Sequence, residues 1–254
     1  MNEPFFYASL KSAFGLLNEG VPPTPIVPFM DEHKLEPLYE LLFGVVRGFG
    51  TPVGYKQEQN GKIIQHIVPN PKTEYSQISS SSKTVLEYHT ETAFHAYKPD
   101  YVMLFCMRSD PAAATTLCYI DDILEHIPTD CLYLLSSPMY ETTVDESFRT
   151  NGEPDHAFKT SVLSVKNHEI QFCYDRSVMR GVNPAAQDAL NLLSEVIDEH
   201  AQAVHLDAGD LLILNNSKVV HGRTPFQARY DGTDRWLLRM LIRKDVSDIP
   251  YELE

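Results

Sequence analysis

Two histidines and one glutamate have the types and the spacing to bind a catalytic metal. His89 and Glu91 lie two positions apart, and His221 follows much later in the chain. In an extended strand, residues two apart point to the same side, so we expect His89 and Glu91 to face one cavity. Two imidazoles and one carboxylate are the ligand set of a mononuclear non-haem iron(II) site, which leaves coordination positions open for a co-substrate and dioxygen.

The residues that flank these candidate ligands are more specific than the short motif itself. The run around the first pair is YHTETAFHAYKPDY (88–101), and His221 begins HGRTPF (221–226), which is followed by RYDGTDRWLLR (229–239). These runs resemble the clavaminate synthase-like branch of the iron(II)/2-oxoglutarate-dependent oxygenases, which includes hydroxylases of free arginine in antibiotic biosynthesis. With two weaker segments, GYKQEQNG (54–61) and HIVP (66–69), the resemblance covers the chain from about residue 54 to residue 243.

The resemblance implies that His89, Glu91 and His221 are the iron(II) ligands, with 2-oxoglutarate and dioxygen as co-substrates. Two neutral imidazoles and one carboxylate leave the site with residual positive charge, which suits chelation by the 2-oxo acid end of a dianion. Halogenases of the superfamily carry a small residue in place of the glutamate, so that chloride can bind. Glu91 therefore favours hydroxylation, or another oxidation, over chlorination.

The same resemblance assigns the distal carboxylate of 2-oxoglutarate to Arg235. A guanidinium is a planar bidentate fork that stays charged at any working pH, so it suits this carboxylate better than a lysine would. A threonine hydroxyl completes the clamp in the family. Thr116 is the expected counterpart here, and the sequence does not separate it from Thr115.

Three further residues are candidate substrate contacts. Arg239 lies on the same expected strand as Arg235, and by resemblance it helps to hold an amino acid's carboxylate; Ser79 resembles the family's substrate-contacting serine. The arginine hydroxylases grip the guanidinium with two acidic residues two apart. This chain offers only Asp175 there, and Arg176 follows it. A half-paired guanidinium in a closed pocket is costly, so this departure leaves free arginine in doubt.

Several functions therefore stay open at this point. We expect hydroxylation of an unactivated C–H in an amino acid or an amino-acid-derived substrate of specialised, antibiotic-type metabolism. The alternatives are a cyclic dipeptide, a peptide or a carrier-tethered residue, and desaturation or cyclisation. A non-catalytic metal-binding barrel would not need Arg235, and a zinc hydrolase would need a positioned general base, for which no HExxH motif is present.

Composition indicates which binding partners and which cellular compartment to expect. The net charge of −14, from 21 basic and 35 acidic residues, argues against nucleic acid, which requires a concentrated basic surface. No apolar run is long enough for a membrane span and the start lacks a basic signal region, so we expect no membrane partner and a cytoplasmic protein that acts on a small molecule. The four cysteines lack metal-ligand spacing, and we expect buried free thiols.

The elements that must position these residues are mostly short strands. Helical periodicity predicts helices over 33–47 and 184–200. The predicted strands are 62–68, 85–91, 101–107, 132–135, 162–165, 170–174, 203–206, 211–214, 219–221 and 236–242. Many short strands with intervening turns indicate a mainly β jelly roll with flanking helices, and the family resemblance makes it the double-stranded β-helix. We expect one domain over 1–254, with a polar insert at about 139–160 that covers the active site as a lid.

Overall fold

The centre of the protein is a pair of antiparallel sheets, which the computed structural model shows for residues 4–26, 32–148 and 157–247. The strands of the larger sheet are β1 (Phe5–Ser9), β2 (Thr51–Val53), β3 (Gln65–Ile67), β5 (Tyr101–Arg108), β13 (Asp210–Asn215) and β15 (Trp236–Arg243). Their order is β1-β13-β5-β15-β2, and β3 also pairs with β15. The smaller sheet contains β4 (Leu86–His89), β6 (Thr115–Tyr119), β12 (Gln202–Val204) and β14 (Val219–Arg223), in the order β12-β6-β14-β4.

Strand β5 is apolar on both faces because both faces are covered. Val102, Leu104 and Cys106 point into the core between the two sheets, which also contains Leu117 of the smaller sheet. The alternate positions, such as Phe105, point to the opposite side. The two sheets thus form the jelly-roll core that the sequence predicts.

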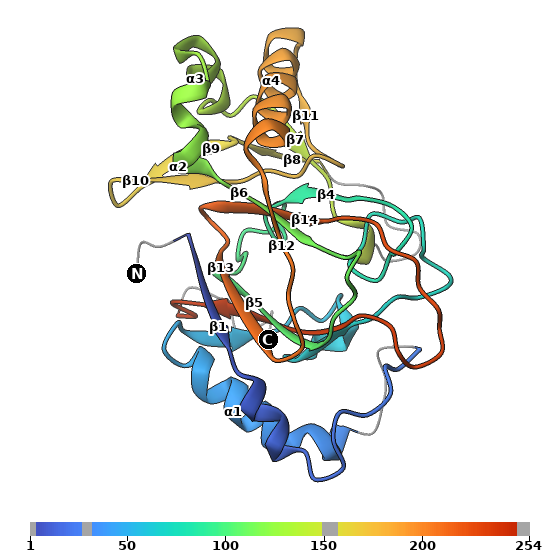
Figure 1. The fold of residues 1–254 in the computed structure, drawn as a ribbon. Coiled ribbons are helices and arrows are strands. Elements are labelled where there is room, and N and C mark those ends of the chain that lie inside the picture. Colours follow the sequence, from blue (N-terminus) through green and yellow to red (C-terminus); the bar gives the residue numbers. More distant parts are fainter. Residues whose placement is uncertain (1–3, 27–31, 149–156, 248–254) are drawn as a thin grey trace.

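Helices cover the outer face of each sheet (Figure 1). Helix α1 (Glu36–Val46) packs against the larger sheet through Leu38 and Leu42, and it follows η2 (Glu32–Leu35). Helices α2 (Ile120–Ile123), α3 (Thr129–Leu135) and α4 (Pro184–His200) lie over the smaller sheet. The side chain of Asn183 caps α4 by accepting a hydrogen bond from the Ala186 amide at 2.9 Å. Three more short 3-10 segments are η1 (Lys11–Leu16), η3 (Gln59–Gly61) and η4 (Leu124–His126).

The polar insert at 139–160 has regular structure in the part that the structure describes. Strand β7 (Tyr140–Thr142) pairs with both β8 (Phe158–Thr160) and β11 (Arg180–Gly181), and η5 (Glu146–Phe148) follows β7. Residues 149–156 of the insert lie outside the described residues. A separate hairpin, β9 (Leu163–Lys166) and β10 (Glu169–Phe172), comes next. Short strands therefore position the described ends of the insert.

Several predicted strands differ from the structure in their bounds, such as 62–68, of which only Gln65–Ile67 is a strand, and two differ in ways that affect the argument. Residues 132–135 belong to helix α3, because Cys131 and Leu135 lie on one buried helical face against α4. A short apolar run has no clear period, so helix and strand are hard to distinguish there. The predicted strand 85–91 ends at His89, and Thr92 has a left-handed φ of 50°. The prediction also missed β1, β2, β6–β8 and β11, several of which are only two or three residues long.

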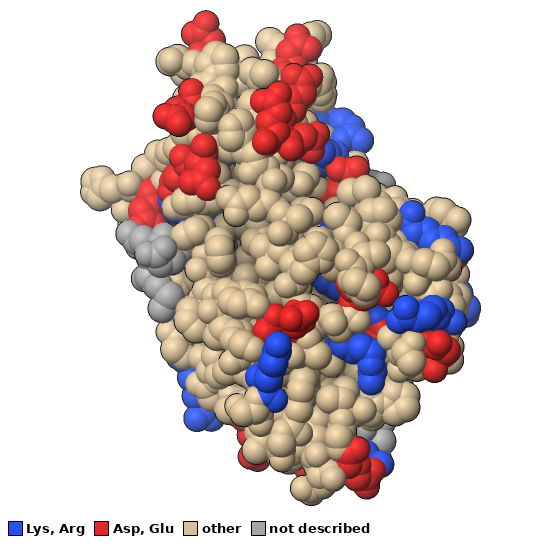
Figure 2. All heavy atoms as spheres, viewed as in Figure 1, with Lys and Arg blue, Asp and Glu red and all other residues tan. Residues whose placement is uncertain are grey.

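On the face drawn in Figure 2, acidic side chains are unevenly distributed. Figure 2 shows many of them over α3 and α4. This acidic surface lies outside the smaller sheet, so the net charge of the chain says little about the charge of a cavity between the sheets. Among the described helices, none has the length and apolar character to cross a membrane.

Candidate active site

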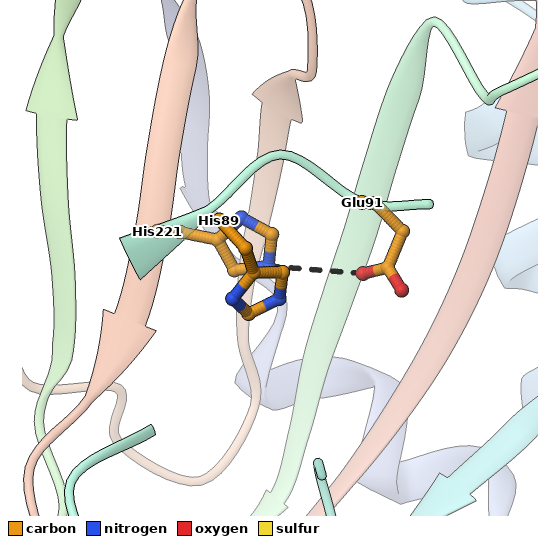
Figure 3. A group of neighbouring side chains, drawn as sticks. All are labelled: His89, Glu91 and His221. Atoms are coloured by element: carbon orange, nitrogen blue, oxygen red, sulfur yellow. Dashed lines mark ion pairs between the residues drawn. The ribbon is translucent and has the colours of Figure 1, made fainter. Parts of the chain in front are cut away.

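His89 and His221 come together because their strands are neighbours in the smaller sheet. His221 on β14 lies directly opposite His89 on β4, and their ring centroids are 4.4 Å apart. The Glu91 carboxylate completes the group, with its Oε2 at 3.7 Å from His221 Nε2 (Figure 3). One ligand atom from each residue lies within 4.8 Å of the others. The two histidines and the glutamate form a group that could hold one metal ion.

The close approach of the two histidine strands requires a glycine. A Cβ on Gly222, the residue after His221, would lie 2.4 Å from the backbone oxygen of Leu86. A real Cβ does not come so close to backbone, so any side chain at this position would push β4 and β14 apart. Gly222 therefore allows the two histidine strands to lie close together, although it offers no ligand atom.

Glu91 reaches the group by a turn and not by the regular strand that we expected. Strand β4 ends at His89, and the side chain of Asn216 holds the chain beyond it. The Asn216 Oδ1 accepts a hydrogen bond from the Glu91 amide at 2.7 Å, and its Nδ2 donates to the Glu91 carbonyl at 3.0 Å. His89 and Glu91 do line one cavity, as predicted. The reason given for it, a regular strand, applies only up to His89, where β4 ends.

The protonation state of His221 and the hydrogen bond of His89 both suit a metal. Burial, with His89 and Arg239 nearby, holds the pKa of His221 well below its usual range, so this imidazole is neutral. The Nδ1 of His89 lies 2.8 Å from the Glu87 carbonyl, and donation to that oxygen leaves Nε2 as an acceptor. The Nδ1 of His221 is buried with no hydrogen-bond partner among the described residues. Neutral imidazoles beside a carboxylate are a donor set that fits iron(II).

Arg239 binds the other oxygen of Glu91. Its Nη1 donates to Glu91 Oε1 at 2.8 Å, its Nε donates to Gln65 Oε1 at 2.8 Å, and its Nη2 forms an ion pair with Glu58. Burial lowers the pKa of Arg239, but the carboxylates of Glu58 and Glu91 outweigh it and raise that pKa. The guanidinium is therefore charged, and it fixes which oxygen of Glu91 faces the histidines.

Two cavities meet at this group and share Ser79, Leu86, His89, Glu91 and Arg239 in their walls. The first lies toward the insert and is rich in acidic side chains. The second lies between the sheets. Its remaining walls are Ile67, Leu104, Thr115, His221, Gly222, Arg223, Arg235 and Leu237.

The second cavity contains two buried arginines for which the described residues supply no carboxylate partner. Burial lowers the pKa of Arg235 to about 10, and no Asp or Glu of the described residues lies within salt-bridge distance of it. Its polar contact is with Thr115 Oγ1 at 3.5 Å. Burial and the charge of Arg235 lower the pKa of Arg223 to about 9. A buried guanidinium without a counter-charge is costly, so this cavity suits an anionic ligand.

Strand alternation separates the two threonines. Thr115 pairs with Arg223 across β6 and β14 and faces the cavity. Thr116, the expected counterpart of the family's clamp, faces the other side of the sheet, where its hydroxyl interacts with Tyr88. The structure therefore places Thr115, and not Thr116, beside Arg235.

Ser79 and Asp175 both line the acidic cavity, so the structure brings them to the site. Asp175 Oδ1 accepts hydrogen bonds from the Ser177 amide, the Ser177 hydroxyl and the Val178 amide. Arg176, which follows Asp175 in the sequence, donates to Asp198 at 2.8 Å and is not among the walls of this cavity.

Sequence reasoning missed five residues of the site. They are Glu58, Gln65, Asp145, Asn216 and Arg223. Glu58 lies within the GYKQEQNG segment (54–61). Arg223 lies two residues after His221 on the same strand, so the alternation of side chains along a strand predicts that both point to the same side. Asn216 and Asp145 lie in turns, where no periodicity indicates the direction of a side chain.

Two facing sheets with a two-histidine, one-carboxylate group define a non-haem iron oxygenase of the jelly-roll type. The model of the Taurine catabolism dioxygenase TauD, TfdA family matches residues 27–241. The chain belongs to this family, and it is a 2-oxoglutarate-dependent iron dioxygenase.

Curated relatives act on amino acids or related small molecules. The chain is 35% identical over 230 residues to L-asparagine oxygenase of Streptomyces coelicolor, with 89% of this chain and 68% of the relative covered. It is 31% identical over 251 residues to L-lysine 3-hydroxylase of Catenulispora acidiphila, covering 92% and 70%. It is 34% identical over 202 residues to clavaminate synthase 2 of Streptomyces clavuligerus, covering 78% and 62%. The last match agrees with the resemblance read from the sequence.

Solved structures give the same fold. Asparagine oxygenase in complex with Fe(II), 2S,3S-3-hydroxyasparagine and succinate matches with a TM-score of 0.83 and 31% identity, over 95% of this chain and 75% of that one. The oxygenase OrfP in complex with Fe, succinate and (3S)-hydroxy-L-Arg matches with a TM-score of 0.84 and 26% identity, over 96% and 77%. These neighbours hold iron and succinate, in agreement with iron(II) and 2-oxoglutarate as the cofactors.

Proposed function

We propose that this protein hydroxylates an unactivated C–H of a free amino acid, with iron(II), 2-oxoglutarate and dioxygen. The observation that carries the proposal is the position of the histidine–glutamate group, where two cavities meet. One cavity contains Arg235, which has no carboxylate partner among the described residues, and the other is acidic. Relatives named for the oxidation of asparagine, lysine, ornithine and arginine support an amino acid as the substrate. A role in specialised, antibiotic-type metabolism agrees with clavaminate synthase 2 among the relatives.

His89, Glu91 and His221 would hold the metal. Bound iron(II) and 2-oxoglutarate supply the oxidising power, since oxidative decarboxylation to succinate and carbon dioxide accompanies the reduction of dioxygen. The protein's own part is to keep the His221 imidazole neutral and to orient the carboxylate. Burial does the first for His221, and Arg239 does the second by holding one oxygen of Glu91.

Arg235 would bind the distal carboxylate of 2-oxoglutarate, with Thr115 beside it. The support is that Arg235 is buried, faces the cavity that reaches the metal group, and lacks a described carboxylate partner. Its pKa of about 10 keeps the guanidinium charged at neutral pH, so a carboxylate would supply the missing counter-charge.

Arg239 and Ser79 would contact the substrate's α-amino acid group. Arg239 already pairs with Glu58, so a zwitterion could exchange charges with this pair, its carboxylate going to Arg239 and its ammonium to Glu58. A carrier-tethered residue has lost the carboxylate charge and would leave Arg239 without that gain. This arrangement favours a free amino acid over a tethered one.

Two broader expectations from the sequence stay proposals. We propose that the insert at 139–160 covers the acidic cavity within a single domain, and Asp145 in the wall of that cavity supports this role. We also propose a cytoplasmic location. The four cysteines are buried and unpaired, which agrees with a reducing compartment.

The test of this function is succinate release from 2-oxoglutarate by anaerobically iron-loaded protein after oxygen is admitted, across amino acids, cyclic dipeptides and carrier-bound residues. We expect a free amino acid to stimulate turnover. His221→Ala should abolish the stimulation, whereas His205→Ala, at an exposed histidine, should retain it. Stimulation by a carrier-bound residue alone would contradict the choice of substrate. The absence of any iron-dependent succinate would contradict the enzymatic function.

A further inference from the structure

Thr92, the residue after Glu91, has a backbone conformation that its residue type disfavours. Its φ of 50° lies in the left-handed region, where the Cβ of an L-residue crowds a carbonyl oxygen, and β-branched residues are found there least often. Thr92 is β-branched and fully buried. The other described non-glycine residues with a left-handed φ are neither β-branched nor buried: Gln59, Asn60, Asn167, His168 and Tyr230. The strain at Thr92 therefore differs from that of an exposed turn.

The chain is fixed on the N-terminal side of Thr92. Strand β4 ends at His89, and residues 91–94 form a turn. The Thr90 amide donates to the Tyr174 carbonyl at 2.7 Å, and the Asn216 side chain bonds both the amide and the carbonyl of Glu91. The peptide plane between Glu91 and Thr92 thus has a defined orientation.

The chain is also fixed on the C-terminal side of Thr92. The His95 amide donates to the Thr92 carbonyl at 2.9 Å, which closes the turn. The ring of Phe94 packs against Phe148, with the ring centroids 5.1 Å apart. The orientation of the Thr92 carbonyl is therefore set as well.

The φ of Thr92 connects these two fixed parts of the chain. Relaxation from 50° to the usual negative values would be a rotation of roughly 100° or more. After such a rotation, either Asn216 would lose the Glu91 carbonyl or the His95 amide would lose the Thr92 carbonyl. The left-handed conformation thus keeps Glu91 in the position where its carboxylate approaches the histidines.

The buried side chain of Thr92 explains how a disfavoured conformation can persist. Strained residues occur where the surrounding structure over-determines them, and these places are often functional sites. A β-branched side chain has few rotamers, so its packing in the core also restricts the backbone that carries it. Glycine would adopt the same φ without strain, but it would leave the turn beside Glu91 more freedom.

We propose that Thr92 is a positioning residue for the metal. Its left-handed backbone, held by its buried branched side chain, keeps the Glu91 carboxylate directed at His89 and His221. The strain is present before a metal binds, so iron(II) meets a ligand set that is already assembled.

Thr92→Gly and Thr92→Ala separate the backbone from the side chain. Both variants lose the packing, but glycine accepts a left-handed φ and alanine does not. At ordinary positions alanine is the more stabilising of the two residues. Here we expect metal-free Thr92→Gly to unfold roughly 2–4 °C above metal-free Thr92→Ala.

Metal binding provides the second measurement. We expect Thr92→Ala to lose roughly tenfold or more in iron(II) affinity by anaerobic equilibrium dialysis, and Thr92→Gly to lose less. The absorption bands of cobalt(II) in the site depend on ligand geometry, and they should change in Thr92→Ala. Thr92→Val keeps the branched shape without the hydroxyl, so it should retain the iron(II) affinity and the cobalt(II) spectrum of the wild type.

His168 provides the matched control. It is exposed in the turn between β9 and β10 and has a left-handed φ of 65°, far along the chain from the metal group. His168→Gly should also be more stable than His168→Ala, because the backbone requirement is the same. The iron(II) affinity should be unchanged in both variants.

Two results would overturn the proposal directly. One is a Thr92→Ala protein at least as stable as Thr92→Gly, and the other is wild-type iron(II) affinity and cobalt(II) spectrum in folded Thr92→Ala. A loss in Thr92→Val equal to that in Thr92→Ala would assign the effect to the hydroxyl and also contradict it.

The test remains decisive if Thr92→Ala does not fold. Thr92→Gly then carries the affinity measurement, and wild-type affinity in that variant would exclude a role for the branched side chain. Iron(II) and cobalt(II) binding are measured without substrate. The outcome is therefore independent of whether the enzyme oxidises a free amino acid.

Discussion

The side-chain amide of Asn216 satisfies both backbone groups of Glu91. Its Oδ1 accepts from the Glu91 amide at 2.7 Å and its Nδ2 donates to the Glu91 carbonyl at 3.0 Å, and the same Nδ2 donates to the Pro99 carbonyl at 2.9 Å. Asn216 lies in the turn that precedes β14, the strand that carries His221. One amide thus ties the glutamate of the metal group to the strand of its distal histidine.

Asn216→Ala should therefore weaken metal binding. Two buried backbone groups of Glu91 would lose their partner, and the turn would no longer hold the carboxylate in place. We expect a loss of roughly tenfold or more in iron(II) affinity, the usual size for residues that orient ligands, measured by anaerobic equilibrium dialysis. Asn191→Ala, at an exposed position on α4, is the control. Wild-type affinity in a folded Asn216→Ala protein would contradict this role.

Arg235→Lys should raise the KM for 2-oxoglutarate. Lysine keeps the positive charge but lacks the planar fork, so one of two parallel hydrogen bonds is lost. We expect an increase of about tenfold or more, a larger one for Arg235→Gln, and a much smaller effect on the KM for the amino acid. Steady-state kinetics with each substrate varied in turn measures both values. An unchanged KM for 2-oxoglutarate would place its carboxylate elsewhere.

Arg223 joins the histidine strand to the loop that carries Ser79. Its guanidinium donates to the Ser79 carbonyl at 3.3 Å, the Ser81 hydroxyl at 3.0 Å and the Thr84 carbonyl at 3.2 Å. Because Ser79 lines both cavities, the loop borders the co-substrate side and the substrate side alike. Arg223 is a positioning residue in this arrangement.

Arg223→Gln should accordingly raise the KM for 2-oxoglutarate and for the amino acid together, with a smaller change in kcat. We also expect a loss of about 1–3 kcal/mol in the free energy of unfolding, because buried acceptors lose a charged donor. Denaturant unfolding and steady-state kinetics test the two effects. Arg229→Gln removes a half-exposed guanidinium and serves as the control. A selective change in only one KM would argue against a shared loop.

His66 gives a prediction for the pH dependence of stability. Its side chain is fully buried, Trp236 Nε1 donates to its Nδ1 at 3.2 Å, and the Tyr39 hydroxyl lies 2.8 Å from its Nε2. Burial lowers the pKa of His66 to about 4, against an ordinary value of 6.5. Between these values the unfolded chain binds a proton that the folded protein excludes, so acid favours unfolding.

The free energy of unfolding should thus fall as the pH drops from about 6.5 to about 4, and His66 should account for about 3 kcal/mol of the loss. Other groups titrate in the same window, so the measurement is the difference between wild type and His66→Gln in urea unfolding at pH 7, 5.5 and 4. The variant should be less stable at pH 7 and closer to wild type at pH 4. A constant difference across this range would exclude His66 as the cause.

Much of the fold and of the metal group follows from local patterns in the sequence. Helix α4 begins and ends at the predicted residues because a cap, a proline and an apolar stripe agree. Strands β5, β13 and β15 agree with their predicted ranges to within one or two residues, because each is a long run of apolar residues. Residues 132–135 were assigned to the wrong element because four apolar residues carry no period.

The sequence by itself determined which residue types could form the chemistry: two histidines, a glutamate and two arginines inside recognisable runs. Only the tertiary structure decided that Thr115 and not Thr116 lies beside Arg235, that Glu58 pairs with Arg239, and that Asp145 and Asp175 line one cavity. The physical reason is that residue type and spacing set the local conformation, while these contacts join distant segments. Such contacts depend on strand register and on how turns pack against the core, and neither has a local signal.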